Sequence, residues 1–456
     1  MRLLVVIGLV VALAAISAFA GDYADGVKFA ESKDYARAAS SFRKAAEQGD
    51  AAAQSVLGAM YDEGQGVPQD YKQALYWYEK AATQGNAGAQ YNLGVIYSTG
   101  QGVAQDGKQA LYWYEKAAVQ GHSGAQFNLG LMFSKGQGVP QNYKQAAFWH
   151  EKAAAQGIAK AQFGLGVQYD LGLGVTRDEK RALYWHEKAA AQGFAAAQSV
   201  LGARYSNGQG VAQDYKQALY WYEKAAAQGD ADAEFGLGLL YAKGAGVALD
   251  YKQGMLWFRK AAAQGNADAQ FAMGLMYANG NGVSQDYKEA VSLYEKAAVQ
   301  GHSNAQVNLG FMYEEGKGVA QDQKRAVFWW EKAAAQGNAA AQSKLASIAN
   351  ASQNLTLEAL KLCQREAVSK LDDGVSPADV IANAVHAACR RELDALILAR
   401  APTSAGSRDF REGIEQKTLP EITRMVLVYR AGKRQTPGRQ KSNPQATPPR
   451  PKPMEM

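Results

Sequence analysis

The sequence predicts an all-α protein, built as a solenoid of stacked helix pairs, on three observations. A pattern recurs every 36 residues through most of the 456-residue chain. Within each unit the apolar residues recur at helical spacing, and Gly recurs where helices would end. A fixed period without insertions indicates one supersecondary element that stacks on its neighbours, because a lone helix pair cannot bury its own apolar face.

The first twenty residues have the composition of a targeting segment. Arg2 precedes an apolar run over residues 3–16, and an A-x-A site ends at Ala20. We expect a cleaved secretory signal peptide over residues 1–20 and a periplasmic or secreted mature chain. The alternative is a retained membrane anchor, but the run is short and ends in small residues.

Residues 21–49 predict a helix pair, with helices over 23–30 and 35–48 and a short loop between them. The terminal face of a stack would otherwise expose apolar surface to water. We therefore expect this pair to cap the array.

Eight full units fill residues 50–337. In the first unit, Ala53, Leu57 and Tyr61 recur at i, i+4 and i+8 and predict the apolar face of a first helix. Gly58 lies beside Leu57, and we expect it to let two helix backbones approach closely.

A Gly-x-Gly connection follows the first helix of each unit. We expect Gly64 to end the first helix, Asp70 to cap the start of the second helix and Gly85 to close it. A phosphate-binding role for Gly-x-Gly is disfavoured, because a dinucleotide fingerprint needs a preceding strand and a third Gly. Seven units carry a Trp in the second helix, expected in the core: Trp77, Trp113, Trp149, Trp185, Trp221, Trp257 and Trp329.

One column of the first helices differs from unit to unit. We interpret it as surface that the stacking leaves free. It contains Met60, Ile96, Met132, Gln168, Arg204 and Leu240.

Residues 89–121 follow the pattern A-x-x-x-L-G-x-x-Y-x-x-G-x-G-V-x-x-D-x-x-x-A-x-x-W-x-x-K-A-A-x-x-G. The chain thereby resembles the Sel-one-like (SLR) repeat family, a relative of the tetratricopeptide repeat, over about two thirds of its length. The resemblance implies a right-handed superhelical α/α solenoid with a concave groove, a role as adaptor or scaffold in protein complexes, and no catalytic residues. It also makes residues 21–49 a tetratricopeptide-like cap.

Residues 338–431 are expected to form C-terminal capping helices. A ninth first helix starts near Ala341, the array of repeats stops there, and further helices are predicted over 356–370, 376–400 and 420–431.

The two cysteines, Cys363 and Cys389, lie in this segment. If the chain turns at Gly374, their heights in an antiparallel hairpin differ by roughly 6 Å. An exported chain with two Cys favours a disulfide between them, and the alternative is a pair of buried free thiols.

The formal net charge of +6 resides in the C-terminal tail, because residues 430–456 hold seven basic residues and one acidic residue. The balanced body disfavours nucleic acid as the main ligand. Residues 432–456 also hold six of the eleven prolines, so we expect a disordered tail. The tail could contact anionic envelope components weakly, or it could simply be solvated.

Few residues suggest chemistry. His122 and His302 share one turn position, and His150 and His186 replace a Tyr in another; we interpret all four as repeat drift. A metal site would need His150 and His186 to converge with an acid such as Glu151, and no zinc-type spacing is present. We therefore expect no metal, no cofactor and no enzymatic activity.

One Ser-x-x-Lys occurs at residues 41–44. It matters because a cysteine-rich branch of the resembled family is linked to β-lactam binding and hydrolysis. The chain lacks the paired cysteines of that branch and the partner motifs of β-lactamases, so a hydrolase is a remote alternative.

The main functional hypothesis is a surface for an extended peptide or partner helix. Gly164, Val200, Gly236 and Ala272 interrupt the Asn row of this surface, and a structural role for the whole set is the alternative. The candidate partner-binding residues are Asn92, Asn128, Asn308, Tyr91, Phe127, Phe163, Phe235 and Phe271.

Taken together, these observations predict an exported scaffold that binds other proteins. A second reading is an envelope scaffold for polysaccharide or peptidoglycan machinery that uses the cationic tail.

Overall fold

The computed structural model describes residues 20–372, 375–400, 420–429 and 431, and this part of the chain contains helices and no strand. The chain divides into two units, residues 1–300 and 301–456, which are described separately. Residues 1–19 of the predicted signal peptide over 1–20 and the predicted tail over 432–456 lie outside the described residues.

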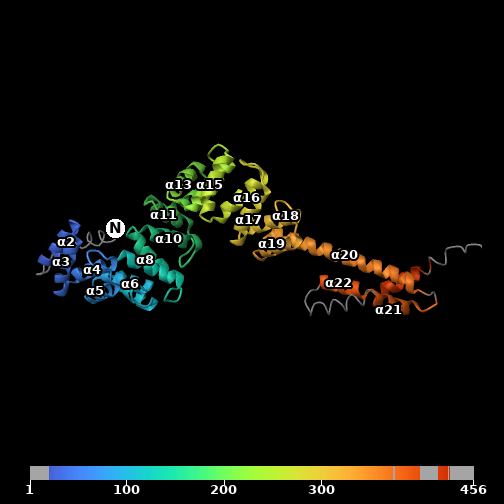
Figure 1. Ribbon diagram of the computed structural model, residues 1–456, viewed down its shortest axis with the longest axis horizontal. Coiled ribbons are helices and arrows are strands. Elements are labelled where there is room, and N and C mark those ends of the chain that lie inside the picture. Colours follow the sequence, from blue (N-terminus) through green and yellow to red (C-terminus); the bar gives the residue numbers. More distant parts are fainter. Residues whose placement is uncertain (1–19, 373–374, 401–419, 430, 432–456) are drawn as a thin grey trace, which may run out of the picture. The chain divides into compact units, whose positions relative to one another are not determined.

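Helix pairs stack side by side along the first unit (Figure 1). The first helices of the pairs are α2 (Ala20–Glu31), α4 (Ala51–Glu63), α6 (Ala87–Thr99), α8 (Ser123–Lys135), α10 (Ala159–Leu171), α12 (Ala195–Asn207), α14 (Ala231–Lys243) and α16 (Ala267–Asn279). The second helices are α3 (Tyr35–Glu47), α5 (Tyr71–Thr83), α7 (Gly107–Val119), α9 (Tyr143–Ala155), α11 (Glu179–Ala191), α13 (Tyr215–Ala226), α15 (Tyr251–Ala263) and α17 (Tyr287–Val299). Several neighbouring first helices also contact one another, as α4 does with α6 and α12 does with α14, so the first helices line the inner side of this stack.

The predicted helix ends are confirmed. Gly64 ends α4 in the left-handed conformation, with φ of 67°. The Asp70 carboxylate accepts hydrogen bonds from the backbone N–H groups of Lys72 and Gln73 at 2.9 and 3.1 Å. Gly85, with φ of 89°, follows α5. A left-handed Gly ends a helix and a capping carboxylate starts the next one, so these residues set the length of each helix.

The expected role of Gly58 is wrong in its detail. A Cβ atom at Gly58 would lie 2.7 Å from Cδ1 of Tyr78. Gly58 therefore leaves room for the ring of Tyr78 rather than for a second helix backbone. The close approach between repeats is made by the second Gly of Gly-x-Gly. At Gly102, a Cβ atom would lie 2.5 Å from the Cβ atom of Tyr71 in the preceding repeat.

The residue after the recurrent Trp, rather than the Trp itself, forms the deepest part of the core. Trp77 is buried, but most Trp residues of this column are only half-buried, whereas Tyr78 and Tyr114 are 1% and 2% exposed. The Trp rings pack edge-on against an exposed aromatic neighbour, as Trp113 does against Tyr112 with centroids 4.9 Å apart. The prediction that the Trp residues are core residues is therefore only partly correct.

The column interpreted as free surface is buried, so that interpretation is wrong. Its members face the core from the first helices, where successive repeats meet. They include the polar side chains of Gln168 and Arg204, which are 4% and 3% exposed.

A buried glutamine near the start of each first helix ties neighbouring repeats together. Gln126 on α8 donates from Nε2 to the carbonyl oxygen of Ala118 in α7, at 3.1 Å. Its Oε1 accepts a hydrogen bond from Nε2 of Gln156, which follows α9, at 2.8 Å. The same two bonds recur along the first unit, and we call these residues the glutamine ladder: Gln54, Gln90, Gln126, Gln162, Gln198 and Gln270.

Glu234 is the one departure from the ladder within the first unit. Its carboxylate accepts a hydrogen bond from Nε2 of Gln264 at 2.8 Å, as a Gln at this position would. An ionised carboxylate has no proton to donate to the carbonyl eight residues earlier, so the second bond of the ladder has no donor here.

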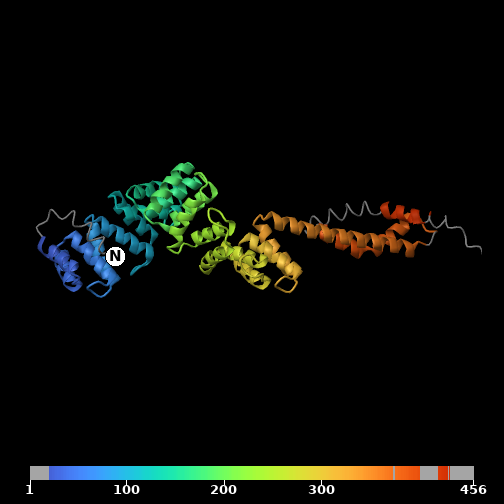
Figure 2. The same cartoon turned by 90° about the horizontal axis from the view of Figure 1, so that it is seen from above.

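The second unit contains α18 (Ser303–Glu315), α19 (Gln323–Ala335), α20 (Ala339–Leu371), α21 (Ala378–Ala388) and α22 (Arg390–Arg400). Figures 1 and 2 both show α20 as one long helix with α21 and α22 beside it. The predicted break between a ninth first helix near Ala341 and a separate helix over 356–370 is wrong, because one helix spans both. Residues 339–371 contain neither Gly nor Pro, so nothing in this segment ends the helix.

The predicted helix over 376–400 is divided in two at Cys389, and Cys389 is bonded to Cys363. The predicted pairing of the cysteines is thus present, with Cα atoms 5.8 Å apart. Residues 420–429 are helical, and Ile422 and Val426 are fully buried against Leu360 of α20 and its neighbours. The capping role expected for residues 338–431 stays a prediction.

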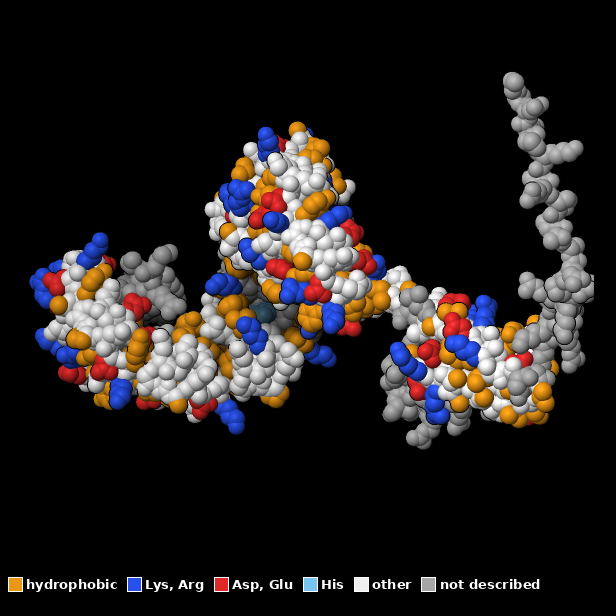
Figure 3. All heavy atoms as spheres, turned by 45° about the vertical axis from the view of Figure 1, so that its right-hand side comes forward, with side chains coloured by type: hydrophobic (Ala, Val, Ile, Leu, Met, Phe, Trp, Pro, Cys, Tyr) orange, Lys and Arg blue, Asp and Glu red, His pale blue; other side chains and the backbone are white. Residues whose placement is uncertain are grey.

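Acidic and basic side chains are interspersed over the visible face of the described residues (Figure 3). This mixture matches the balanced charge of the chain before its tail.

Replacing Gln126 by Ala should destabilise the protein by about 2 kcal/mol, because the Ala118 carbonyl and the Gln156 amide each lose a buried partner. Thermal and urea unfolding would measure the change. Gln109→Ala, at an exposed side chain of α7, is the matched control. Equal stabilities for Gln126→Ala and Gln109→Ala would contradict the role given to the ladder.

Conversely, replacing Glu234 by Gln should raise the midpoint of thermal unfolding, because the amide supplies the donor that the carboxylate lacks.

Candidate functional site

The aromatic residues proposed for partner binding lie within the helix pairs. Each ring is half-buried and packs against the buried ring of a second helix. The centroid distances are 5.9 Å for Tyr91 with Tyr114, 6.0 Å for Phe127 with His150, 5.4 Å for Phe163 with His186, 5.7 Å for Phe235 with Phe258 and 5.8 Å for Phe271 with Tyr294. These contacts give the aromatic column a packing role.

Two of the proposed asparagines interact with buried tyrosines. Burial raises the pKa of Tyr78 well above its ordinary value, and Asn92 opposes this rise. Burial raises the pKa of Tyr114 to about 12, and Ser98, whose Oγ lies 3.2 Å from this hydroxyl, and Asn128 oppose this rise. Asn308 lies half-buried in the second unit.

The histidines of the turn position are helix caps. Nδ1 of His122 accepts a hydrogen bond from the backbone N–H of Ala125 at 3.2 Å, and Nδ1 of His302 accepts one from Ala305 at 3.0 Å. The interpretation as repeat drift thus missed a function that Asn and Asp serve at this position in other repeats, for example Asn86.

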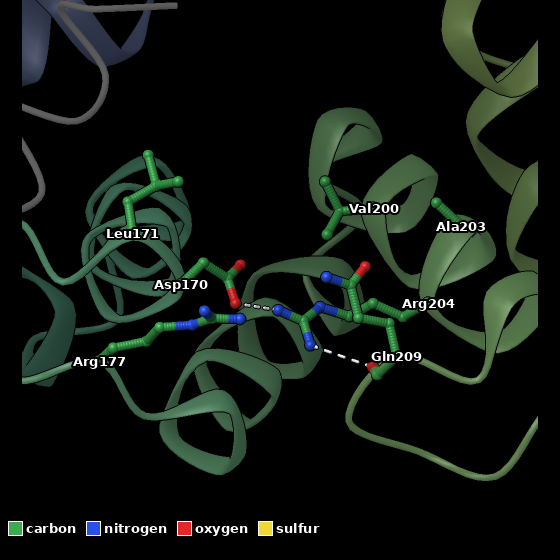
Figure 4. Close-up of a pocket in the computed structure, with 7 residues that line it drawn as sticks. All are labelled: Asp170, Leu171, Arg177, Val200, Ala203, Arg204 and Gln209. Atoms are coloured by element: carbon green, nitrogen blue, oxygen red, sulfur yellow. Dashed lines mark hydrogen bonds and ion pairs between the residues drawn. The ribbon is translucent and has the colours of Figure 1, made fainter.

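A pocket of about 500 Å³ opens between two successive repeats, at the C-terminal ends of α10 and α12. We call it the Arg204 pocket. It includes Val200, a position of the proposed Asn row, so it opens on the helix face that the sequence singled out. Its lining residues are Asp170, Leu171, Arg177, Val200, Ala203, Arg204 and Gln209 (Figure 4).

Asp170 links two buried side chains at this pocket. Its Oδ2 lies 2.9 Å from Nε2 of His186, and its Oδ1 accepts from Nη2 of Arg204. Arg204 also donates from Nη1 to the carbonyl oxygen of Gln209 at 3.2 Å (Figure 4). The His186 and Arg204 side chains are 0% and 4% exposed, whereas that of Asp170 is 25% exposed. The carboxylate therefore connects the core to the pocket.

His186 is held in its neutral form. Burial lowers its pKa, and this effect outweighs the opposing influence of Asp170. Because a carboxylate only accepts, Nε2 carries the proton, and Nδ1 is left as an acceptor. This Nδ1 is buried and has no hydrogen-bond partner.

Further buried polar atoms without partners lie close by in the chain. Nδ1 of His150 lies 3.0 Å from Oε1 of Gln168, while Nε2 of each residue has no partner. Nε of Arg204 is also unpaired. Such atoms are costly in an apolar core, so their concentration in neighbouring repeats sets this region apart.

The sequence contained a signal for this site that we misread. Gln168 and Arg204 stand in a column of apolar residues, and His186 stands in a column of aromatic ones. The interpretation of the Gln168 and Arg204 column as free surface, and of His186 as repeat drift, gave these polar residues no role in a site. A buried column gives the same substitutions a different meaning.

The Arg204 pocket is suited to binding. Its lining residues carry no hydroxyl or thiol and so offer no side-chain nucleophile of that kind. Among the described residues, no group of three or more His, Cys, Asp or Glu side chains could hold a metal ion. Within the same part of the chain, no helix has the length and hydropathy needed to cross a membrane.

A scan against family models matches the Sel1 repeat in nine consecutive segments: residues 19–50, 51–86, 87–122, 123–158, 159–194, 195–230, 231–266, 267–302 and 303–338. The array therefore has nine repeats rather than the expected eight, because the N-terminal pair counts as a repeat. No curated protein matches the chain.

Two solved structures are similar over most of their lengths. The crystal structure of c5321, a protective antigen of uropathogenic Escherichia coli strains with an SLR fold, is 29% identical, with a TM-score of 0.66 over 97% of this chain and 99% of that one. A Sel1 repeat protein from Oxalobacter formigenes is 38% identical, with a TM-score of 0.53 over 67% of this chain and 90% of that one. The predicted helical solenoid is thereby confirmed.

Replacing His150 by Tyr should make stability less dependent on pH. Burial lowers the pKa of His150 below its ordinary value, so on acidification the unfolded chain binds a proton before the folded chain does. The stability from the neutral imidazole is complete above about pH 6.5 and is lost as the pH falls below it. A Tyr fits here, because Tyr222 holds the same position beside Gly236 as His150 does beside Gly164.

Thermal unfolding of both proteins between about pH 7 and pH 5 would measure this difference. Parallel curves of unfolding temperature against pH for His150→Tyr and the wild type would contradict it.

Proposed function

The chain belongs to the Sel1 repeat family, and from this premise we propose that it is a scaffold that binds a partner protein through the inner face of its first helices, with no chemistry of its own. Sel1 repeat solenoids commonly serve as scaffolds for protein interactions. We define the inner face by its half-buried residues in consecutive repeats of the first unit: Asn92, Val95, Asn128, Leu131, Gly164, Val167, Val200 and Ala203.

Two properties of the inner face support this proposal. Its residues differ from repeat to repeat, whereas the Asp or Asn caps of the second helices and the glutamine ladder hardly change. When the surface residues vary and the residues that stabilise the fold do not, the surface can become specific for one partner without loss of stability. The Arg204 pocket also opens on this face, and it is the observation that carries the proposal, because a concave site with a few fixed polar groups is typical of ligand binding.

We also propose that the protein is exported. The apolar segment over residues 3–16 and the A-x-A site before residue 21 support a cleaved signal peptide. The pair formed by Cys363 and Cys389 is in keeping with an oxidising compartment. Attachment of residues 433–456 to anionic envelope material, and a role as a scaffold for polysaccharide or peptidoglycan machinery, stay predictions.

A photo-crosslinking residue at Leu131 should capture a discrete partner in cells, because this side chain lies on the inner face in α8. The matched control carries the same residue at Tyr112, which is 48% exposed on the outer helix α7. Mass spectrometry of the adducts would identify the captured protein. Equal capture from both positions, or capture from Tyr112 alone, would count against the inner face.

Export predicts that the mature protein begins near Gly21. N-terminal sequencing of protein recovered from the periplasm or the medium would measure this. An intact Met1 on protein confined to the cytoplasm would refute export and leave the scaffold proposal in place.

A further inference from the structure

We propose, on the basis of the scaffold function above, that the Arg204 pocket binds an acidic side chain of the partner, whose carboxylate lies between Arg177 and Arg204.

Arg177 is placed at the pocket by a departure from the repeat. The corresponding residue of other loops is a Gln that donates from Nε2 to a backbone carbonyl seven residues earlier, as Gln105 does to Ser98 and Gln141 does to Ser134, each at 2.8 Å. Arg177 points toward Asp170 and Arg204 instead (Figure 4). Its ion pair with Glu179, at 2.7 Å, joins side chains that are 63% and 44% exposed. Such a pair contributes little, so a ligand carboxylate can replace Glu179.

Arg204 supplies the buried part of the site. The guanidinium is held in place by Asp170 and by the carbonyl of Gln209, and its Nε has no partner. An arginine fixed in this way is prepared for a carboxylate, since its planar group offers five donors in a rigid arrangement.

The charge and the shape of the pocket select the ligand. The lining contains two arginines and one carboxylate, and Glu179, which pairs with Arg177, lies outside the lining and is 44% exposed, so a ligand carboxylate that displaces Glu179 meets the positive charge of Arg177. Val200 and Ala203 form an apolar wall beside the arginines (Figure 4). A carboxylate on a short methylene chain satisfies both features, whereas a basic side chain would face two like charges.

The departures from the repeat converge on this one place. Asp170 stands where the neighbouring repeats have Ser134 and Ser206, and Arg177 stands where most loops have Gln. His186 and Arg204 replace an aromatic and an apolar residue. Their ion pairs and hydrogen bonds join them into one cluster, which independent drift at separate positions would not be expected to produce.

The test uses the full-length protein and a library of random peptides displayed both internally and with free C-termini. The peptide family selected by the wild type should share an acidic residue. A synthetic member of this family should bind about tenfold more tightly than its Glu→Gln or Asp→Asn analogue, as measured by calorimetry.

Two variants should abolish that preference. Arg177→Gln installs the residue that other loops carry, and the triple change Asp170→Ser, His186→Tyr and Arg204→Met restores the common residues of the repeat, so both should fold. Lys216→Gln, which removes one exposed positive charge from α13, is the matched control and should keep the preference.

An equal preference for the acidic peptide in the wild type and in both variants would overturn the proposal and leave the scaffold function standing. A preference that depends on a free C-terminus rather than on an acidic side chain would also overturn it. If the wild type selects no peptide family while the crosslinker at Leu131 captures a partner, the pocket assignment fails; if neither happens, the scaffold proposal fails with it.

Discussion

The glutamine ladder is the interaction on which the stacking of the repeats depends. A helix pair has backbone groups at its ends that need partners, and each buried Gln supplies a donor to the preceding repeat and an acceptor to its own second helix. An amide can do both at once, which neither a carboxylate nor an apolar side chain can. The ladder thus ties the end of one repeat to the next, and the aromatic core fills the space beside it.

A frame built in this way tolerates local change. Each repeat contacts mainly its neighbours, so a substitution in one interface does not propagate along the array. In repeats 159–194 and 195–230 several core positions have become polar, and the resulting buried groups are only partly satisfied. Such groups lower stability unless they serve recognition, and here they support a pocket at the surface.

The candidate site therefore differs from the one that the residue pattern suggested. Asn92 and Asn128 interact with buried tyrosines, and the aromatic column packs inside the helix pairs. The inner face retains the variable residues around them. Recognition on this face would combine a broad peptide-binding surface with one charged contact at Arg204. A few such residues can supply most of the specificity of a large interface.

The sequence by itself determined the period, the helix ends at Gly64 and Asp70 and the solenoid class. These features follow from local backbone preferences and from repetition, which are visible in one dimension. Only the tertiary structure decided that the column of Gln168 and Arg204 is buried and that α20 continues without a break. It also decided that Asp170, Arg177 and Arg204 meet. Burial and ion pairing depend on which helix lies opposite each side chain, and the periodicity of one helix does not contain that information.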